Sequence, residues 1–439
     1  MTDQPGARGE RERPLMVFHA PYPLAERTAA SRLRPVRMRR AFADLGYDVV
    51  EVTGYAAHRR RAMARAEQRL DDYERFRRTD ASLPPAFVYS ENATIPNALT
   101  EPRHLPPHPR LDAAFFSRMR RRGLEVGVFY RDLYWRFPRF RQNIPPALDA
   151  VLRAAYLTEL AQWRRAGLHV YLPSEAMAEH LPVIDAAMTH PLPPGADPLA
   201  VHNPSRPALE DGGDLDLLFV GVLGGNYRIE AICRAVEAVE GTSLTLCTRQ
   251  EEWEQARQTY EPLLPAGRHD VVHASGADLE PLYGRAGLGV LLVQPHEYWD
   301  FAVPYKLYEY LAHELPVVAT AGTETARIVE ELGAGWVIPY DEDALAALLR
   351  DLRAHPDRLA AVRKRIRQVL PGQTWLARAR RVARDLSGWA PDLPDGSPDD
   401  SDDGDDTNDT DDAADINDIN DINDTNDPRD PRDAERTQP

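Results

Sequence analysis

A helix flanked by two short apolar runs is the feature that most constrains the fold. The two runs are residues 288–295, Leu-Gly-Val-Leu-Leu-Val-Gln-Pro, and residues 317–320, Val-Val-Ala-Thr. Short apolar runs of this kind are typical of buried parallel strands. The helical stretch between them starts at Pro304 and breaks near Pro316. Such a strand–helix–strand unit requires a parallel sheet. Its helix N-terminus opens at the carboxyl ends of the strands, where open α/β sheets bind ligands.

Two charged residues, Lys306 and Glu309, stand at the start of this helix. Arginine supplies 51 of the 53 basic residues, and Lys364 is the only other lysine. Lys306 therefore reads as a site residue, with chance as the alternative. Residues three apart share a helix face, so we expect Lys306 and Glu309 to point outward while Leu307 and Leu311 pack inward. Together with the free N–H groups at the start of the helix, these two residues predict a nucleotide diphosphate ligand. Lys306 and the N–H groups would bind its phosphates, and the Glu309 carboxylate would accept hydrogen bonds from a sugar diol. A surface ion pair is the alternative.

Composition predicts two or three domains and no membrane span. The chain has 439 residues, 43% of them hydrophobic and 28% charged, and no apolar run approaches about 18 residues. Residues 1–13 are polar, so we expect a disordered N-terminus without an export signal and a cytoplasmic protein. Cys233 and Cys247 lie in separate apolar stretches, which predicts reduced core thiols and no metal site.

The net charge of −16 comes entirely from the C-terminus. Residues 391–439 contain 18 Asp and one Glu against three Arg, in repeats with almost no apolar residues. Such a segment is predicted to be a disordered, solubilising tail; a calcium loop is an alternative that lacks the closing Glu and the central Gly. The remaining chain is neutral, but residues 14–195 carry +8 and residues 196–390 carry −8.

Apolar runs and helical stretches alternate along both halves, which predicts α/β domains with doubly wound parallel sheets. The proline-rich stretch at residues 189–198 marks the boundary between a first domain, residues 14–198, and a second domain, residues 199–390. The expected strands are 15–20, 48–53, 85–90, 126–130, 169–172, 215–221, 243–247, 270–273, 288–293, 317–320 and 336–339, and the expected helices include 34–45, 58–80, 228–239, 252–263 and 278–286.

This layout resembles the group 1 glycosyltransferases, retaining enzymes of the GT-B fold with two Rossmann-like domains facing across a cleft. Pro304-x-Lys306-x-x-Glu309-Tyr310 resembles their donor-site signature, residues 193–197 (Pro-Pro-Gly-Ala-Asp) resemble their hinge, and residues 279–288 resemble the helix before their donor loop. The resemblance implies an acceptor domain followed by a donor domain. It implies transfer from a nucleotide diphosphate-sugar to a glycan or lipid-linked acceptor, without metal or other cofactor, in cell-surface polysaccharide or glycoconjugate synthesis.

The resemblance also assigns site residues, with several departures from the family pattern. Val222 and Arg228 stand where the family commonly has Arg and Lys, and Phe301 stands where it often has Glu, with Asp300 and Glu297 nearby. Residues 21–25 replace the family's glycine-rich first loop, and Arg131-Asp132 replaces its His-Asp. The implied catalytic residues are Lys306 and Arg228; the implied donor-binding residues are Glu309, Pro304, Tyr305, Tyr310, Gly221 and Arg249; candidates for further donor-sugar or acceptor contacts are Asp300, Arg32, Arg131 and Asp132.

Two other functions remain open from the sequence. A nucleotide-sugar epimerase of the same fold would need cleft carboxylates and histidines, for which His19, Glu91 and Asp132 are candidates. A non-catalytic sugar-nucleotide-binding partner of a polysaccharide assembly complex is the other alternative. Nucleic-acid binding is not expected, because the basic half contains no recognisable module.

The basic first half also predicts peripheral membrane association. Arginines cluster at residues 37–40, 59–61 and 118–122, and aromatic residues interleave with them at residues 131–141. We expect this face to dock on anionic lipid, with Tyr134, Trp135, Phe137 and Phe140 entering the headgroup region. A solvated set of helix faces is the alternative.

Overall fold

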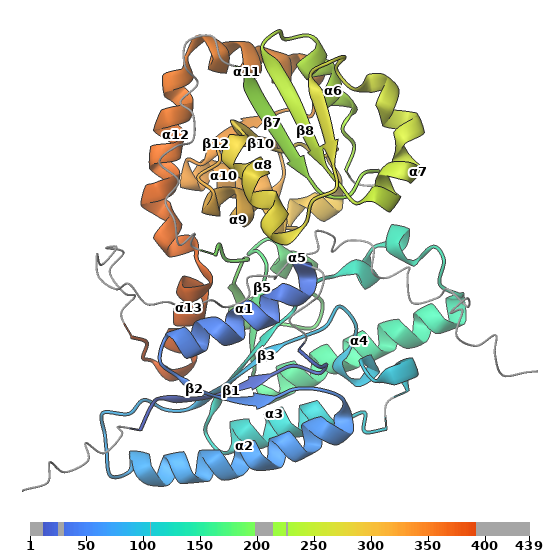
Figure 1. The fold of residues 1–439 in the computed structure, drawn as a ribbon. Helices are drawn as coiled ribbons and strands as arrows, with labels where there is room; N and C mark the ends of the chain where they lie inside the picture. Colours follow the sequence, from blue (N-terminus) through green and yellow to red (C-terminus); the bar gives the residue numbers. More distant parts are fainter. Residues whose placement is uncertain (1–11, 25–29, 106, 198–213, 225–226, 392–439) are drawn as a thin grey trace, which may run out of the picture.

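Two α/β domains, one stacked on the other, make up the described part of the chain (Figure 1). The computed structural model describes residues 12–24, 30–105, 107–197, 214–224 and 227–391. The first domain contains a parallel sheet in the order β2-β1-β3-β4-β5-β6, and the second a parallel sheet in the order β12-β11-β10-β7-β8-β9. The predicted fold class, two doubly wound parallel sheets, is confirmed.

In the first domain, alternate residues of each strand face opposite layers of helices. On β1, Leu15 and Val17 pack toward one core and Met16 and Phe18 toward another. Helices α2 and α3 cover one face of the sheet and α1 covers the other (Figure 1). The elements are β1 Leu15–His19, α1 Ala30–Asp44, β2 Asp48–Val52, α2 Ala56–Arg77, β3 Phe87–Glu91, α3 Leu111–Arg121, β4 Glu125–Phe129, α4 Pro146–Ala166, β5 His169–Leu172, α5 Met177–His180 and β6 Thr189–Pro191.

The second domain repeats this arrangement around β7. Leu217 and Phe219 share a core with Ile232 of α6, whereas Leu218 shares one with Leu307 of α9. Its elements are β7 Leu215–Val220, α6 Glu230–Glu237, β8 Thr242–Cys247, α7 Gln250–Tyr260, β9 His269–Val272, α8 Glu280–Arg285, β10 Leu288–Leu291, α9 Tyr305–Ala312, β11 Val317–Thr320, α10 Glu324–Leu332, β12 Gly335–Ile338, α11 Glu342–Ala354, α12 Pro356–Val369 and α13 Trp375–Ser387.

The last helix, α13, belongs by its contacts to the first domain. The sequence places it in residues 199–390, the second domain, but its apolar residues Trp375, Ala379 and Val382 share a core with Phe18 of β1 and Phe42 of α1. Their spacing of four and three residues forms one helix face. The chain therefore crosses between the domains twice.

The two crossings lie side by side. Ala196 N–H donates to Gln373 O at 2.7 Å, and Trp375 N–H donates to Ala196 O at 3.2 Å. A side chain at Gly195 would overlap the backbone of Trp375, so this close approach requires glycine. The proline-rich stretch predicted as the domain boundary is therefore part of the hinge, and it also contains the short strand β6, which the sequence reading missed.

Candidate active site

A cavity of about 140 Å³ lies between the two domains. Its first-domain wall comes from the carboxyl ends of the strands and from α1, and its second-domain wall comes from the segment that leads into α9. The first wall includes Arg34, Phe129, Arg131, Asp132, Tyr134 and Met177, and the second includes Tyr227, Tyr298, Trp299, Phe301, Lys306 and Glu309.

Lys306 lies at the second position of α9 and reaches into this cavity rather than into open solvent. Only 8% of the residue is exposed, which argues against the alternative of a surface ion pair. Its ammonium lies 4.2 Å from the ring centroid of Tyr227 and 5.0 Å from that of Phe219. Burial lowers the pKa of Lys306 to about 8, against the opposing effects of Glu309 and Glu252.

Gly221 makes room for this lysine. Its φ of +145° is disfavoured for other residues, and a Cβ at this position would overlap Lys306 Nζ. The prediction that Gly221 belongs to the donor site is untested as a ligand contact, but the structure shows its positional role. Any side chain here would displace the ammonium from the cavity.

Glu309 lies one turn further along α9 and also lines the cavity. Burial raises the pKa of its carboxyl, and the nearby Lys306 lowers it. The Tyr283 hydroxyl donates to Glu309 Oε2 at 3.4 Å. The second wall therefore presents a cation and a carboxylate one turn apart, as the spacing of the motif predicts.

The remaining residues of the motif divide between cavity and core. Pro304 lies just before α9, one residue earlier than expected, and both Pro304 and Tyr305 line the cavity. Tyr310 is fully buried, and its hydroxyl donates to Leu218 O and accepts from Val220 N–H, each at 3.2 Å. The structure therefore gives Tyr310 a role in supporting β7.

Three further predicted residues lie outside the cavity lining among the described residues, as Gly221 and Tyr310 do. Arg228 is half exposed and donates to Glu230 Oε1 from Nε and Nη2, at 3.0 and 2.8 Å. Arg249 immediately precedes α7, and Asp300 is exposed at the end of the loop before Phe301. The side chain of Arg32, a fourth candidate, lies outside the described part of the structure.

The first wall contains Arg131 and Asp132, which follow β4; their proposed contacts with a donor sugar or an acceptor stay predictions. Asp132 Oδ2 accepts from the Tyr298 hydroxyl at 2.9 Å, and Oδ1 accepts from Leu133 N–H at 2.6 Å. Arg131 Nη2 donates to the Tyr22 hydroxyl at 3.2 Å. Asp132 thus links the two domains across the edge of the cavity.

Aromatic residues surround this link. Phe301 stacks on Phe137 at 5.7 Å between centroids, and Tyr298 stacks on Tyr134 at 5.6 Å. The Ser174 hydroxyl donates to Phe301 O at 2.7 Å. The Phe that replaces the family's Glu at position 301 is therefore an interdomain packing residue.

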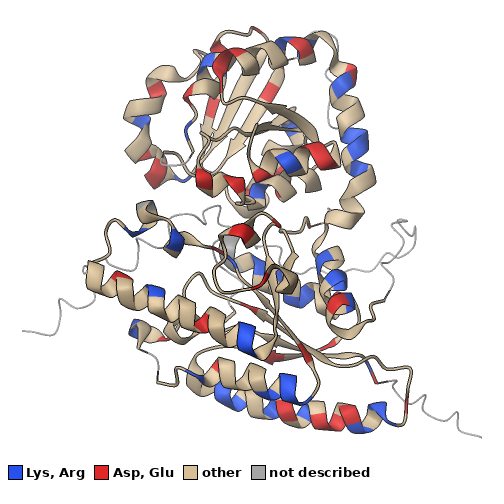
Figure 2. Cartoon of the chain, turned by 180° about the vertical axis from the view of Figure 1, so that it is seen from behind, with Lys and Arg blue, Asp and Glu red and all other residues tan. Residues whose placement is uncertain are grey.

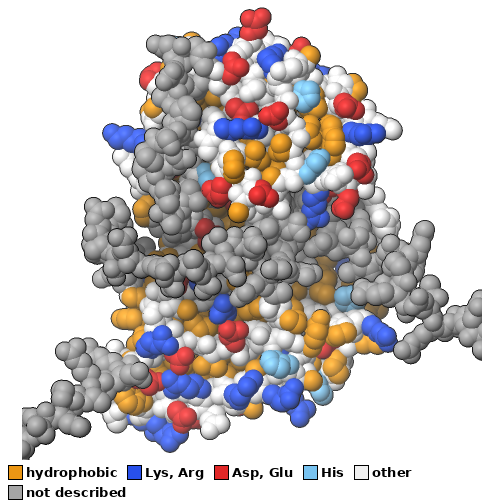
Figure 3. Space-filling view, viewed as in Figure 1, with side chains coloured by type: hydrophobic (Ala, Val, Ile, Leu, Met, Phe, Trp, Pro, Cys, Tyr) orange, Lys and Arg blue, Asp and Glu red, His pale blue; other side chains and the backbone are white. Residues whose placement is uncertain are grey.

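Three of the four predicted membrane anchors are wrong, because their side chains are buried inside the protein. Tyr134, Trp135 and Phe137 are 5–6% exposed and pack within the protein. Arginines of the basic clusters are also paired: Arg59 of α2 contacts Asp112 of α3, and Arg118 and Arg122, in and just after α3, contact carboxylates of α2. Figure 2 shows acidic and basic residues intermixed along α2, and the face in Figure 3 shows acidic side chains among the basic ones of the lower domain.

Arg34 is the charged residue of the cavity lining that the sequence analysis missed. The sequence predicts a helix over residues 34–45 that begins at Arg34, and names Arg32, just before it, as the candidate. Arg34 shares a face of α1 with Met38 and Ala41, which are buried, and it is itself only 5% exposed. Residues four and seven positions apart lie on the same helix face, so the apolar Met38 and Ala41 are the sequence signal that Arg34 lies on the buried face of α1.

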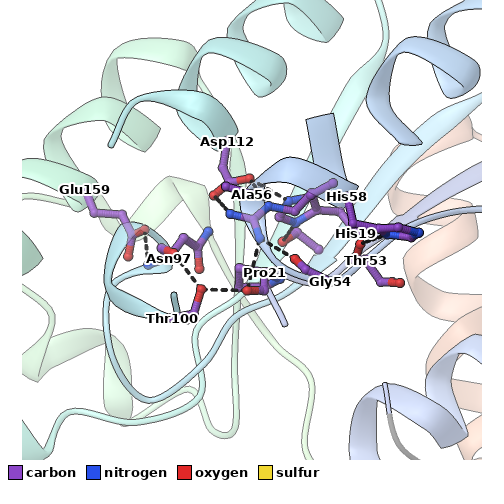
Figure 4. Close-up of polar contacts among 12 residues, drawn as sticks. His19, Pro21, Thr53, Gly54, Ala56, His58, Asn97, Thr100, Asp112 and Glu159 are labelled. Atoms are coloured by element: carbon purple, nitrogen blue, oxygen red, sulfur yellow. Dashed lines mark hydrogen bonds and ion pairs between the residues drawn. The ribbon is translucent and has the colours of Figure 1, made fainter. Parts of the chain in front are cut away.

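The residues considered for an epimerase are mostly occupied in a buried network of the first domain. His19 Nδ1 lies 2.8 Å from Ser90 Oγ, and Nε2 lies 3.1 Å from Asp112 Oδ1. Burial lowers the pKa of His19, against the raising effect of Asp112. Arg59 Nε donates to Asp112 at 2.7 Å, and this network extends to the segment around Thr100 (Figure 4). Neither His19 nor Glu91 lines the cavity among the described residues.

The described residues also bear on metal binding, on the state of the two cysteines and on membrane-spanning helices. In residues 12–24, 30–105, 107–197, 214–224 and 227–391, no group of three or more His, Cys, Asp or Glu is placed to hold a metal ion. Cys233 and Cys247 are free and buried, as predicted, and burial raises the pKa of each thiol. Within the same described ranges, no helix is long and apolar enough to cross a bilayer.

Comparisons with known proteins agree with the two-domain fold. Residues 214–355 match the family described as group 1 glycosyl transferases, whereas no curated protein sequence matches the chain. Among solved structures, a sucrose-phosphate synthase from Thermosynechococcus elongatus is similar with a TM-score of 0.54 and 15% identity, covering 85% of this chain and 98% of that one.

Two further structures share the fold. The Anabaena protein HepE in complex with UDP-glucose has a TM-score of 0.53 and 12% identity, covering 86% of this chain and all of its own. A glycosyltransferase from Rickettsia africae has a TM-score of 0.52 and 10% identity, covering 85% of this chain and 98% of that one. At these identities the likeness establishes the two-domain fold.

Proposed function

We propose that this chain, whose residues 214–355 match the group 1 glycosyl transferases, transfers a sugar from a nucleotide diphosphate-sugar to a glycan or lipid-linked acceptor, in polysaccharide or glycoconjugate synthesis. The observation that carries this proposal is the buried Lys306 at the start of α9, which faces the interdomain cavity with Glu309 one turn away. The UDP-glucose complex of the Anabaena protein makes UDP-sugars the first donors to test.

The second wall provides the groups that the reaction needs. Breaking the sugar–phosphate bond develops negative charge on the leaving diphosphate, and the Lys306 ammonium and the free N–H groups of α9 stabilise that charge. Glu309 accepts hydrogen bonds from the ribose hydroxyls. Because these groups supply positive charge from the chain itself, we propose transfer without a metal ion.

The first wall receives the acceptor and the domain contact excludes water. Tyr298 and Phe301 pack on the first domain beside the cavity, so the acceptor hydroxyl meets the donor sugar in a partly desolvated space. We propose retention of anomeric configuration, as in the family that the motif resembles. An epimerase is less well supported, because His19 and Glu91 are held in contacts outside the cavity lining described above.

The test combines binding and turnover. Nucleotide-sugars are first screened by thermal shift, since a ligand at 100 times its dissociation constant adds about 2.7 kcal/mol to the free energy of unfolding. The stabilising donor is then incubated with candidate glycan and lipid-linked acceptors, and the product's anomeric configuration is measured by NMR. Isomerised donor without acceptor would identify an epimerase, and binding without turnover across the acceptors would identify a binding protein.

A further inference from the structure

We propose that Arg34 is an anion-binding residue of the first wall, which receives a phosphate or carboxylate oxygen of a bound substrate at its Nη2. Arg34 lines the cavity that also contains Lys306. The inference rests on the proposed function, because it concerns the substrates of that same cavity. It adds a residue from the first domain to a site whose motif lies wholly in the second.

The guanidinium of Arg34 is only partly used by the protein. Its Nε donates to Glu91 Oε1 at 3.0 Å, and Nη1 reaches Pro193 O at 3.4 Å. Nη2 is buried and has no hydrogen-bond partner among the described residues. A buried donor without a partner is costly, so its retention in a cavity wall indicates a ligand atom.

The geometry of the ion pair explains why one donor is left over. Arginine and carboxylate usually pair through two parallel hydrogen bonds. Here Glu91 Oε1 accepts from both Arg34 Nε and the Tyr89 hydroxyl, at 3.0 and 2.7 Å. Glu91 therefore holds the guanidinium through Oε1 and Nε alone, and both Glu91 Oε2 and Arg34 Nη2 are buried without a hydrogen-bond partner among the described residues.

Aromatic rings hold the guanidinium plane in position. The Arg34 Cζ lies 3.4 Å from the ring centroid of Phe129 and 5.5 Å from that of Trp375. Phe129 ends β4 and is the register partner of Glu91, so one edge of the sheet positions both the ring and the carboxylate. A fork held in this way is suited to a planar or tetrahedral oxyanion.

The charges around the cavity favour an anionic ligand. Its lining contains three cations, Arg34, Arg131 and Lys306, and two carboxylates, Asp132 and Glu309. Asp132 accepts hydrogen bonds from Tyr298 and from the Leu133 N–H. The anion can come from the donor diphosphate or from an acidic acceptor, and both sources present the same oxyanion chemistry.

The experiment compares Arg34→Gln and Arg34→Lys with Arg39→Gln as the matched control. Arg39 lies on the same helix, but its partner is the exposed Glu51, at 3.3 Å. UDP, ADP, GDP and inorganic pyrophosphate are titrated by calorimetry, and inorganic phosphate is then titrated into protein saturated with the tightest nucleotide. Melting temperatures are recorded for every variant.

If Arg34 binds the diphosphate, Arg34→Gln weakens nucleotide and pyrophosphate binding at least tenfold, Arg34→Lys less, and Arg39→Gln not at all. If Arg34 instead binds an acceptor anion, the nucleotide affinity of Arg34→Gln is unchanged, but inorganic phosphate no longer binds to the nucleotide-saturated variant. Unchanged affinity in both titrations overturns the proposal. Failure of the unsubstituted protein to bind any of these nucleotides counts instead against the proposed function.

A double variant protects the test against misfolding. Arg34→Met combined with Glu91→Gln removes both charges of the buried pair, so neither is left alone in the core. The expected result is a folded protein with the same loss of anion affinity as Arg34→Gln. Anion affinity equal to that of the unsubstituted protein in this folded variant overturns the assignment of Arg34.

Discussion

The two walls of the cavity differ in how the sequence assembles them. In the second wall, Lys306 and Glu309 lie in one turn of one helix. In the first wall, Arg34 comes from α1, Phe129 from β4 and Asp132 from the loop after it. One wall is a local motif, and the other exists only after a whole sheet has formed.

This difference separates two kinds of chemistry. The local wall holds the groups proposed to meet the donor diphosphate and ribose, which many donors share. The assembled wall is the one proposed to face the acceptor, and it departs from the family pattern at Arg131-Asp132. Phe301, the departure on the other wall, packs against it across the domain interface. Variation in the assembled wall can therefore change the acceptor while the donor wall stays the same.

The largest effect is expected from removing the cation of the local wall. Lys306→Ala should lower kcat about 100-fold or more and weaken donor binding less, because charge on the diphosphate grows in the transition state. Steady-state kinetics and calorimetry measure the two effects. Lys364→Ala, at the only other lysine and exposed on α12, should change neither. Equal losses in kcat and affinity would make Lys306 a binding residue only.

Removal of the local carboxylate should act on binding instead. Glu309→Ala should weaken nucleotide-sugar affinity at least tenfold, about 1.4 kcal/mol, because an alanine methyl cannot accept from the ribose hydroxyls. Calorimetry with the nucleotide-sugar and with its deoxyribose analogue checks this assignment. Glu330→Ala on the exposed face of α10 is the control. Unchanged affinity in a folded Glu309 variant would remove the residue from the site.

The pH dependence of binding should report on Lys306 directly. Its pKa of about 8 lies below the usual range because of burial. The ammonium is present below this pH and lost above it, so affinity for a nucleotide diphosphate should fall as pH rises, by about tenfold between pH 7 and pH 9. Calorimetry at several pH values measures the fall. Lys306→Met should bind more weakly with a flat profile, and a parallel fall in that variant would assign the titration to another group.

The sequence predicted the local wall better than the assembled one for a physical reason. Lys306 and Glu309 are related by helical spacing alone, whereas Tyr134 and Phe137 acquire their role from contact with Tyr298 and Phe301, far along the chain. An aromatic and basic stretch has the same pattern whether it faces lipid or another domain. The alternation of elements predicted both sheets, but the return of α13 depends on which sheet offers it the matching apolar groove.

Removing the hydrogen bond between Tyr298 and Asp132 would test how far the assembled wall depends on contact between the domains. Tyr298→Phe removes the hydrogen bond to Asp132 and should lower the free energy of unfolding by about 1 kcal/mol. Acceptor KM should rise severalfold while donor affinity stays constant, because Lys306 and Glu309 are untouched. Urea denaturation and kinetics measure these effects, and Tyr55→Phe, at an exposed tyrosine, is the control. A loss of donor affinity would show that the two walls are coupled.

The smallest effect is expected from the acidic C-terminus. Truncation after Pro391 retains the hydrogen bond from Arg380 Nε to Pro391 O at 2.6 Å and removes all 18 aspartates of residues 391–439. These residues contain almost no apolar side chains, so the melting temperature and kcat should remain nearly unchanged. Differential scanning calorimetry at low and high salt checks this. A lower melting temperature confined to low salt would instead show that the segment docks electrostatically on the arginine-rich first domain, where Arg34 and Arg131 line the cavity.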